Sequence, residues 1–436
     1  KQMNRIFNFN QNFSIRIPIL ITVSFLSIIS LLILESAGNF KTEFFGVMFS
    51  RVQKQILWIF LGSVVFVVIQ FIRLRFFHEK MPFLYTFFLF FILLPFFSEA
   101  TKGAQNWFMG FQPSEFGKII IVISLAKVLS DNKKLLGNIF FLAMCLFMII
   151  APILIFILQR DLGAALIYSS VLLPMFYWSG VKFHMLAFLI SPIFTSYTIL
   201  YLNIFSSYSD QSGYPITLLV VYILINFVYV INFLRQNKIG RRYKIIYISL
   251  YFIFNIIFSF IVSTGWENLN KLDSNRSRDL VGRIENFVIP SLNEFSGGWH
   301  IKQSMVAVGS GGVFGNGIGE GSQVNLRFLP EADTDFVIAS IAEALGFTFI
   351  FLIILICYNL FYWLIFYAQQ STNKFNSLLI IGFSSILFSH IVITMGMAVA
   401  LAPITGIPAP FLSYGGTFTL TCFTMLGICN NATNNK

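Results

Sequence analysis

Apolar stretches long enough to cross a lipid bilayer recur from one end of the chain to the other. With 57% hydrophobic and only 11% charged residues, the chain holds more apolar surface than a soluble core can cover. A membrane β-barrel would instead show short segments of alternating polarity. The sequence therefore predicts an all-α polytopic integral membrane protein with about 12 transmembrane helices. They are expected at roughly 17–34, 56–72, 81–97, 116–130, 138–158, 162–178, 183–203, 215–234, 244–263, 336–358, 377–400 and 411–429.

Lysine and arginine are distributed unevenly between the connecting segments. If the N-terminus lies inside, the inner segments carry most of these cations. The short outer loops then carry only Lys41, Arg51, Lys54, Lys102 and Arg160. Because cytoplasmic loops are enriched in Lys and Arg, both termini are predicted to be cytoplasmic. Membrane orientation and attraction to anionic lipid headgroups explain the formal net charge of +11 without a nucleic-acid partner.

One connection is much longer than the others. Residues 264–335 are polar and glycine-rich, and by the orientation above they face outward. Long ordered loops in compact proteins usually carry function. We therefore predict N-terminal membrane helices at 1–213, a two-helix insertion at 214–263, an extracytoplasmic catalytic loop at 264–335 and C-terminal membrane helices at 336–436.

The outer loop provides side chains suited to holding a sugar and an anionic group together. They are a cation, an acid and three polar residues, namely Arg283, Glu294, His300, Gln303 and Ser304. A solvated surface loop would contain the same residue types, so composition alone leaves both interpretations open. The glycines at 309–317 leave backbone N–H groups exposed and form a candidate anion cradle.

Acidic residues cluster where the outer loop enters the next membrane helix. Glu331, Asp333 and Asp335 precede this helix, where the helix dipole favours negative charge, and we include Glu331 and Asp335 among the substrate-binding candidates. Glu343 falls inside the helix. An ionisable side chain within a membrane helix is costly and by default indicates function, so Glu343 is a further candidate, with a buried structural pair as the alternative. His390, in a later membrane helix, is more typical of a packed, hydrogen-bonded side chain than of a ligand.

Two further polar features lie within the predicted membrane segments. Glu115 and Lys118 are one helical turn apart, so they are expected either to pair with each other or to bind substrate. Residues 406–417 contain two prolines that prevent a regular helix. Irregular backbone at membrane depth is tolerated only where it is buried in protein or lines a polar cavity. Ser413 and Tyr414 are therefore predicted to line the site.

Five blocks of sequence together carry a family resemblance. They are FQPSEFGK at 111–118, QRDLGAAL at 159–166, GGWHIKQSMVAVGSGGVFGNG at 297–317, LPEADTDFVIASIAEALG at 329–346 and GIPAPFLSYGGT at 406–417. In content and order they resemble the signature blocks of the SEDS family of peptidoglycan glycosyltransferases, which includes RodA and FtsW. The final block is more similar to the RodA branch, which acts in cell elongation and shape determination, than to the FtsW branch of cell division.

The resemblance implies an activity, a partner and a location. Family members join the disaccharide units of lipid II into glycan strands outside the bacterial cytoplasmic (inner) membrane, alongside a class B penicillin-binding protein that cross-links them. The family has a ten-helix core, so the runs at 215–234 and 244–263 are predicted to be two extra helices. Asn106 stands where the family often has Arg.

The largest departure from the family pattern falls at the expected catalytic acid. The family places an Asp in the outer loop at the position of Asn293, and Glu294 is its neighbour. Glycosyl transfer needs a base that deprotonates the attacking sugar 4-hydroxyl while a lipid pyrophosphate leaves. A carboxylate can accept this proton and a neutral Asn cannot, so we predict Glu294 as the base. Arg283, Lys118 or a divalent cation, Mg or Mn, would stabilise the leaving group. Loss of polymerase activity is the competing interpretation.

Two other classes of function also suit a chain of this kind. Many membrane helices with intramembrane charges and a proline-broken segment are typical of a transporter or a flippase of a lipid-linked cell-wall precursor. The long polar outer loop favours surface chemistry over a binding site at the membrane midplane. A noncatalytic scaffold for wall synthases is the third possibility.

Overall fold

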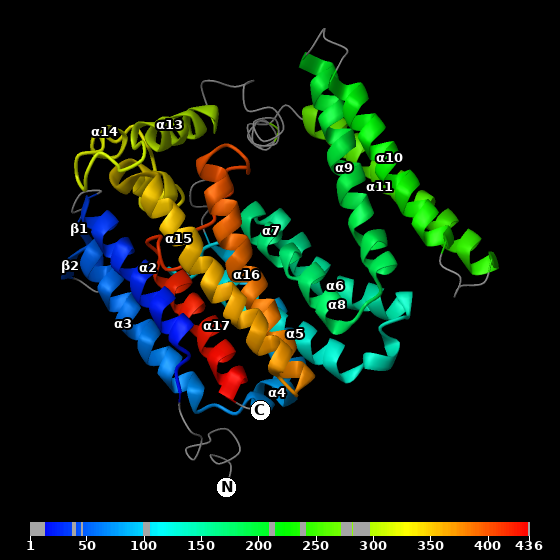
Figure 1. Cartoon of the computed structure of the whole chain (residues 1–436), viewed down its shortest axis with the longest axis horizontal. Coiled ribbons are helices and arrows are strands. Elements are labelled where there is room, and N and C mark those ends of the chain that lie inside the picture. Colours follow the sequence, from blue (N-terminus) through cyan, green and yellow to red (C-terminus); the bar gives the residue numbers. More distant parts are fainter. Residues whose placement is uncertain are drawn as a thin grey trace. The chain divides into compact units, whose positions relative to one another are not determined.

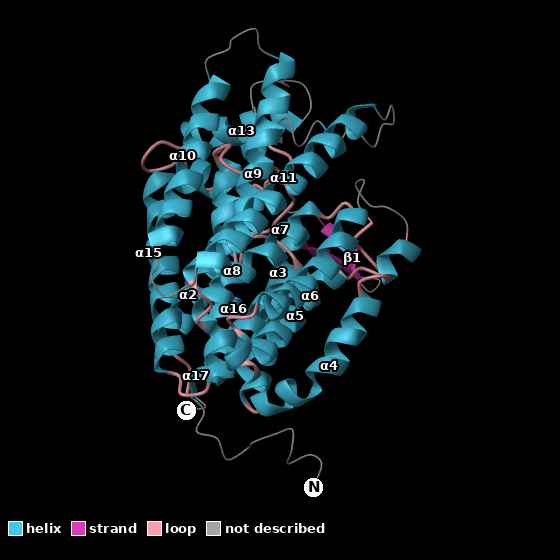
Figure 2. Cartoon of the chain, turned by 90° about the vertical axis from the view of Figure 1, so that its right-hand side faces the viewer, coloured by secondary structure: helices cyan, strands magenta, loops and turns pink. Residues whose placement is uncertain are grey.

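The computed structural model describes residues 14–36, 41–44, 47–98, 105–208, 214–235, 241–271, 281 and 297–434. These residues are mostly helical, as predicted, with irregular connections and one hairpin of strands β1 (Lys41–Phe44) and β2 (Val47–Ser50) (Figure 2). The longer helices are α2 (Ile17–Ser36), α3 (Arg51–Gln70), α4 (Leu74–Phe91), α5 (Pro113–Asp131), α6 (Ile139–Leu158), α9 (Phe183–Tyr208), α10 (Tyr214–Arg235), α11 (Arg241–Lys271), α15 (Val337–Gln370), α16 (Lys374–Ala398) and α17 (Gly416–Asn434). Shorter ones are α7 (Leu162–Ser170), α8 (Leu172–Ser179), α13 (Gly297–Ser310) and α14 (Ser322–Asn325).

Every predicted apolar run contains helix, although the run at 162–178 is divided between α7 and α8 and the run at 411–429 becomes helical only at Gly416. Within the described residues, nine helices are long and apolar enough to cross a bilayer. The runs that do not meet both conditions correspond to α5, which carries several charged side chains, to α10, whose apolar part Val220–Arg235 is shorter, and to α17, which is rich in Thr and Asn. The chain is therefore a multi-pass membrane protein, and the total of twelve spans stays a prediction.

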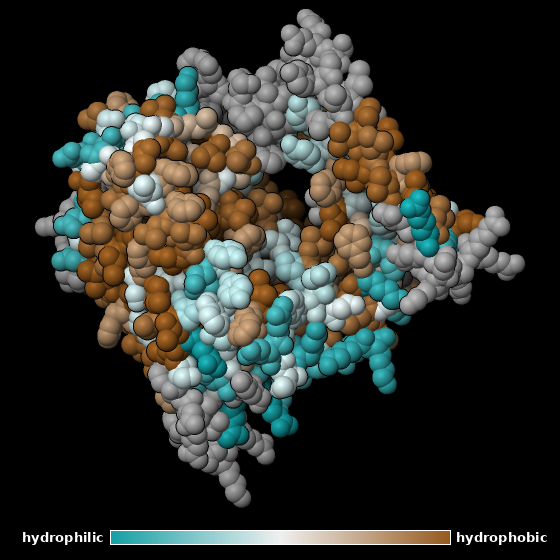
Figure 3. All heavy atoms as spheres, in the orientation of Figure 1, coloured by the Kyte–Doolittle hydropathy of each residue, from teal (hydrophilic) through white to brown (hydrophobic). Residues whose placement is uncertain are grey.

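The outer surfaces of the long helices are apolar, as a lipid environment requires. On α15, Phe347, Phe351 and Leu355 are 62%, 51% and 47% exposed. Apolar residues cover much of the visible helical surface in Figure 3. Side chains of this kind would be unfavourable in water, and in a bilayer they contact lipid tails.

The chain divides into two compact units. The first contains residues 1–180 and 300–436, and the second contains residues 181–299. In the first unit α16 is the central helix, since it packs against α5, α7, α8, α15 and α17 (Figure 1). Two-thirds of its most apolar stretch, 67%, is buried. Polar side chains on α16 are thereby held inside the protein and away from lipid.

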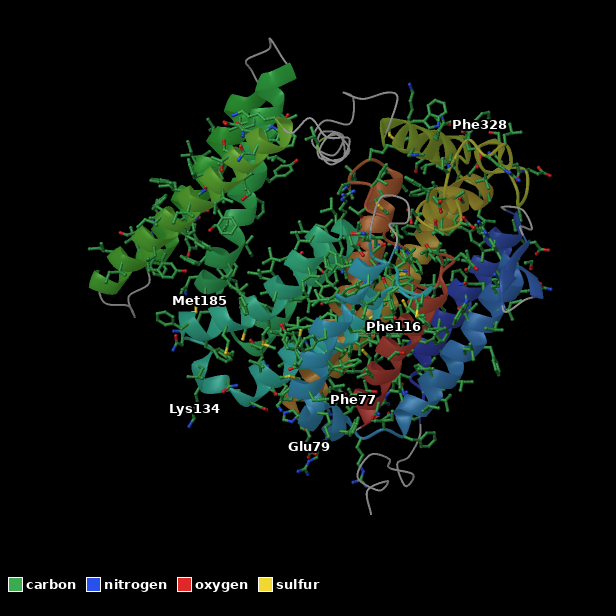
Figure 4. The ribbon with its side chains drawn as sticks, turned by 180° about the vertical axis from the view of Figure 1, so that it is seen from behind. Phe77, Glu79, Phe116, Lys134, Met185 and Phe328 are labelled. Carbon is green, nitrogen blue, oxygen red and sulfur yellow. The ribbon has the colours of Figure 1, made fainter. Side chains whose placement is uncertain are left out.

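The two described ends of the first unit are in direct contact. Ser14 Oγ donates to Asn434 Oδ1 at 2.9 Å, and Asn434 Nδ2 donates to the Ser14 carbonyl at 2.8 Å. Residues 14 and 434 therefore lie on the same side of the membrane. Glu79 and Lys134, from predicted inner loops, lie at the end of the bundle opposite to Phe328 of the outer loop (Figure 4). This arrangement agrees with the predicted alternation of inner and outer loops.

The second unit consists mainly of α9, α10 and α11, so α9 packs with the predicted two-helix insertion. Its interior contains hydrogen-bonded polar side chains. Asn255 Nδ2 of α11 donates to Ser191 Oγ of α9 at 3.0 Å. The hydroxyls of Tyr229 and Tyr247 both donate to the carbonyl of His184, at 3.0 and 2.7 Å. Polar groups that bond to one another across helices in this way avoid the cost of facing hydrocarbon.

Candidate active site

Glu115 and Lys118 form a buried ion pair in the first turns of α5. The helix begins at Pro113, where the missing N–H of proline costs no intrahelical hydrogen bond. Lys118 Nζ lies 2.8 Å from each carboxylate oxygen of Glu115, and the Lys118 and Glu115 side chains are 2% and 5% exposed. A charge buried to this extent requires a partner, and each residue supplies the partner of the other.

Two residues from other helices complete the surroundings of the Lys118 ammonium. His390 Nε2 of α16 lies 3.1 Å from Lys118 Nζ. The ring centre of Phe418, on α17, lies 5.3 Å from the same atom, within the range of a cation–π interaction. All three N–H groups of the ammonium therefore have acceptors within the protein, two at Glu115 and one at His390. The structure places Lys118 in this internal pair, so the prediction that it contacts the leaving pyrophosphate is not supported.

Asp161 provides a second buried carboxylate at the start of α7. Its Oδ1 accepts the backbone N–H of Ala164 at 2.9 Å and so caps the helix. Its Oδ2 accepts hydrogen bonds from Asn106 Nδ2 at 3.0 Å and Gln112 Nε2 at 2.9 Å. Asn106, for which the sequence resemblance suggests arginine in many relatives, thus binds the carboxylate through a neutral amide.

The segment between α16 and α17 is irregular and is bonded to the residues that precede α15. Ser413 Oγ donates to the carbonyl of Thr334 at 2.6 Å and accepts the N–H of Ala409 at 2.8 Å. The N–H of Tyr414 donates to the carbonyl of Asp333 at 2.9 Å. The broken backbone is therefore held within the protein, which is one of the two conditions under which it is tolerated, and Ser413 uses its hydroxyl to hold this segment together.

Arg51, the first residue of α3, joins the same region from a third direction. It forms an ion pair with Asp333, and its guanidinium carbon lies 5.9 Å from the ring centre of Tyr414. The Asp335 carboxylate lies beside Gly406, 3.6 Å from the point that a Cβ there would occupy. Tyr414 and Asp335 thus each lie where the outer loop meets the irregular segment, and their predicted role in substrate binding stays a prediction.

Glu343 has a structural position instead of the predicted substrate-binding one. Its side chain is fully buried in α15. Its two carboxylate oxygens accept the backbone N–H groups of Gln323 at 2.8 Å and Val324 at 3.2 Å. These N–H groups belong to the first turn of α14 and have no intrahelical acceptor, so the carboxylate caps that turn. Glu343 therefore fixes the outer loop against α15.

The glycine-rich segment at 309–317 packs against α15, which does not support its predicted role as an anion cradle. The N–H groups of Asn316 and Gly317 donate to the carbonyls of Glu343 and Ala344 at 2.9 and 3.0 Å. A Cβ on Gly311 would lie 1.9 Å from the Ala342 carbonyl oxygen, so glycine is required for this close approach. These backbone N–H groups are used within the protein.

Of the remaining predicted residues of the outer loop, some lie within the described residues and the others do not. Ser304 is fully buried and donates to the carbonyl of Ala398 at 2.9 Å, which ties α13 to the end of α16. His300 and Gln303 are half-buried, and Glu331 is exposed and accepts a hydrogen bond from Thr334 Oγ1. Arg283, Asn293 and Glu294 lie outside the described residues.

Two contributors to this region were missed as site residues in the sequence. Asp161 lies within the QRDLGAAL block, so the block itself was the available signal. Arg51 was counted only as a cation of an outer loop, and its partner Asp333 is 282 positions away in the chain. No sequence spacing could have indicated that pairing.

Comparison with known proteins identifies the family. A sequence profile of the cell cycle proteins FtsW, RodA and SpoVE matches residues 12–222 and 211–436. The chain belongs to this family. Peptidoglycan glycosyltransferase RodA of Treponema pallidum is 27% identical over 429 residues, which cover 94% of this chain and 95% of that protein. Peptidoglycan glycosyltransferase MrdB of Escherichia coli K12 is 24% identical and covers 86% of this chain and 84% of its own length.

Solved structures of the family share the fold. RodA of Thermus thermophilus superimposes with a TM-score of 0.56 at 17% identity, over 98% of this chain and 96% of that chain. A chain from a structure described as the coordination of polymerization and crosslinking by a peptidoglycan synthase complex gives a TM-score of 0.64 at 18% identity, over 98% and 97%. At these identities the likeness establishes the fold alone.

The predicted Mg or Mn would require a cluster of ligating side chains. Among the described residues, no group of three or more His, Cys, Asp or Glu side chains could hold a metal ion. The predicted base Glu294 and the predicted cation Arg283 lie outside the described residues. A divalent cation therefore stays a prediction.

Proposed function

We propose that this chain is a peptidoglycan glycosyltransferase that polymerises lipid II into glycan strands at the outer face of the bacterial cytoplasmic membrane. The family membership and the names of the curated relatives support this activity. A class B penicillin-binding protein is the proposed partner, supported by the description of the related synthase complex. In this orientation both ends of the chain face the cytoplasm.

The observation that carries the proposal is that the five sequence blocks meet through hydrogen bonds. Gln112 joins block 111–118 to Asp161 of block 159–166. His390 joins Lys118 to the Pro408 carbonyl of block 406–417. Ser413 of that block bonds to Thr334 of block 329–346, and Asn316 of block 297–317 bonds to Glu343. Blocks far apart in the chain thus form one connected region at the base of the outer loop.

The outer loop would supply the chemistry that this region supports. A base takes the proton of the acceptor sugar's 4-hydroxyl, and the oxygen forms a bond to the anomeric carbon of the donor. The bond from that carbon to the lipid pyrophosphate breaks, and the pyrophosphate leaves with the electron pair. We propose Glu294 as the base, since Asn293 cannot accept a proton. With Lys118 held in its ion pair, Arg283 or a divalent cation is the proposed stabiliser of the leaving group.

Polymerisation by the purified chain tests both parts of the proposal. The protein in detergent is incubated with lipid II, with and without the partner synthase and with and without Mg or Mn, and glycan polymer is measured. Polymer formation in detergent excludes transport as the activity, because no second compartment exists. Absence of polymer under every condition would refute the proposed function.

The choice of base is tested separately by substitution. Glu294→Gln should lower the polymerisation rate by about 100-fold or more, the usual contribution of a general base. Glu320→Gln is the matched control, since Glu320 is an exposed acid of the same loop. Undiminished polymerisation by Glu294→Gln would show that another group is the base, while leaving the proposed function intact.

A further inference from the structure

The hydrogen bonds around His390 fix its protonation state. Lys118 has only donors at its ammonium, so His390 Nε2, 3.1 Å away, must be the acceptor. The ring therefore carries its proton on Nδ1, which donates to the carbonyl of Pro408 at 2.9 Å. His390 is 1% exposed and its ring lies 4.8 Å from that of Phe418. The imidazole is thus a neutral, buried bridge with one acceptor and one donor in use.

We infer that His390 is a positioning residue for glycosyl transfer, which couples the Glu115–Lys118 ion pair to the irregular segment 406–417. This inference rests on the proposed function. The bridge is direct, because Nε2 of the ring contacts the Lys118 ammonium on α5 and Nδ1 of the same ring contacts the Pro408 carbonyl. Without it, the third N–H of Lys118 and the Pro408 carbonyl would both lose a buried partner.

Hydrogen bonds continue from Pro408 into the outer loop. The next residue, Ala409, donates its N–H to Ser413 Oγ at 2.8 Å, and Ser413 Oγ donates to the Thr334 carbonyl at 2.6 Å. A shift of Pro408 would therefore be transmitted to the residues that enter α15. His390 acts at a distance from the reacting atoms, through the shape of the segment that underlies the outer loop.

The geometry also excludes a simple proton relay through His390. Its Nδ1–H faces a carbonyl oxygen, which cannot accept the proton for transfer, and its Nε2 faces an ammonium held by Glu115. A neutral side chain that offers both an acceptor and a donor should therefore replace the imidazole. Glutamine is suitable, since its amide oxygen can accept from Lys118 while its NH₂ group is a donor for the Pro408 carbonyl, whereas the shorter asparagine reaches only the position of Nδ1 and cannot accept from Lys118.

This difference between two amides provides the experiment. Purified wild type, His390→Gln, His390→Asn and His390→Ala are compared in the lipid II polymerisation assay. Folded protein is isolated by size-exclusion chromatography, and its concentration is used to calculate kcat, while KM is obtained from the dependence of the rate on lipid II concentration. We expect His390→Gln to stay within about 3-fold of wild type, and His390→Asn and His390→Ala to lose about 10-fold or more in kcat. KM should change less than kcat, because His390 does not touch the substrate. His78→Gln is the control for the chemical change. His78 lies on α4 and pairs with Asp131 at the end of α5 opposite to Lys118, so this substitution should leave kcat and KM unchanged.

Each outcome bears on the inference. Wild-type kcat in His390→Ala, or equal losses in folded His390→Gln and His390→Asn, would overturn it. If His390→Ala does not fold, the comparison of the two amides decides the matter. A wild-type chain that forms no polymer would refute the proposed function instead, so the two failures are distinguishable.

Discussion

The hydroxyl of Ser413 donates to the carbonyl of Thr334 at 2.6 Å, which joins two segments 79 positions apart in the chain. The same oxygen accepts the N–H of Ala409, so one small side chain satisfies two buried backbone groups. Ser413 is 1% exposed. The Ser413 hydroxyl therefore joins the irregular segment before α17 to the entrance of α15, beside the bond from the Tyr414 N–H to the Asp333 carbonyl.

Replacing Ser413 by alanine should destabilise the protein without altering any charge. The substitution leaves the Ala409 N–H and the Thr334 carbonyl unsatisfied, and each buried unsatisfied group costs about 1–3 kcal/mol. A lower thermal unfolding midpoint in detergent is the expected result. Ser169→Ala is the control, since its hydroxyl bonds only within its own helix. Equal midpoints for the two variants would show that the Ser413 bonds contribute nothing.

The Glu115–Lys118 pair should behave as a unit under substitution. Removing one partner leaves an uncompensated buried charge and is expected to cost about 3–5 kcal/mol of stability. The double variant Glu115→Gln/Lys118→Met removes both charges and should recover most of that loss. Thermal unfolding of the two single variants and the double variant measures the coupling. Additive losses would contradict a direct interaction in the folded protein.

Replacing Glu343 by glutamine should loosen the outer loop locally. A glutamine side chain has one acceptor oxygen, which can accept only one of the two backbone N–H groups. Its NH₂ group would face the other N–H, and two donors cannot bond to each other. We expect the amide protons of Gln323 and Val324 to exchange with solvent about 10-fold faster or more. Hydrogen exchange followed by mass spectrometry checks this. Unchanged exchange in that peptide, with Glu320→Gln as the reference variant, would rule out the capping role.

Two glycines near the base of the outer loop should respond in opposite ways to alanine. Gly346 has a φ of 76° and ψ of −179° inside α15, and a Cβ there would lie 2.3 Å from the Gly315 nitrogen. Gly346→Ala should therefore lower stability by more than about 3 kcal/mol. Gly309 lies in α13 with open space around it, so Gly309→Ala should raise stability by up to about 1 kcal/mol. Thermal unfolding of both variants tests this, and a tolerated Gly346→Ala would disprove the strained geometry.

The helices and the family could be predicted from the sequence because both depend on local information. A bilayer demands long apolar runs, and every run that we identified is wholly or largely helical. The pairing of Glu115 with Lys118 was also within reach, since one helical turn separates them. The sequence also predicts that His390 is a packed, hydrogen-bonded side chain, but it does not indicate which residues are its partners.

Other features of the site depend on contacts between distant segments. Glu343 was assigned to substrate because a charge within a membrane helix usually indicates function, but the first turn of α14 brings two N–H donors to it. The glycines at 309–317 were interpreted as a cradle, whereas the close approach of α15 explains them. In both cases the sequence shows an unusual residue choice, a buried carboxylate or a run of glycines. Only the packing against distant segments shows which contacts explain it.

The contact between Ser14 and Asn434 has a consequence for the engineering of this chain. Because these residues touch, a short linker could join them, and the backbone could be reopened at Ser371–Asn373, the turn between α15 and α16. This turn lies on the same side of the membrane, since Lys374 beside it bonds to the Trp178 carbonyl and Arg16 lies 5.1 Å from the Tyr367 ring. A circular permutant of this design would begin with α16, the central helix, and would insert each helix with its present orientation.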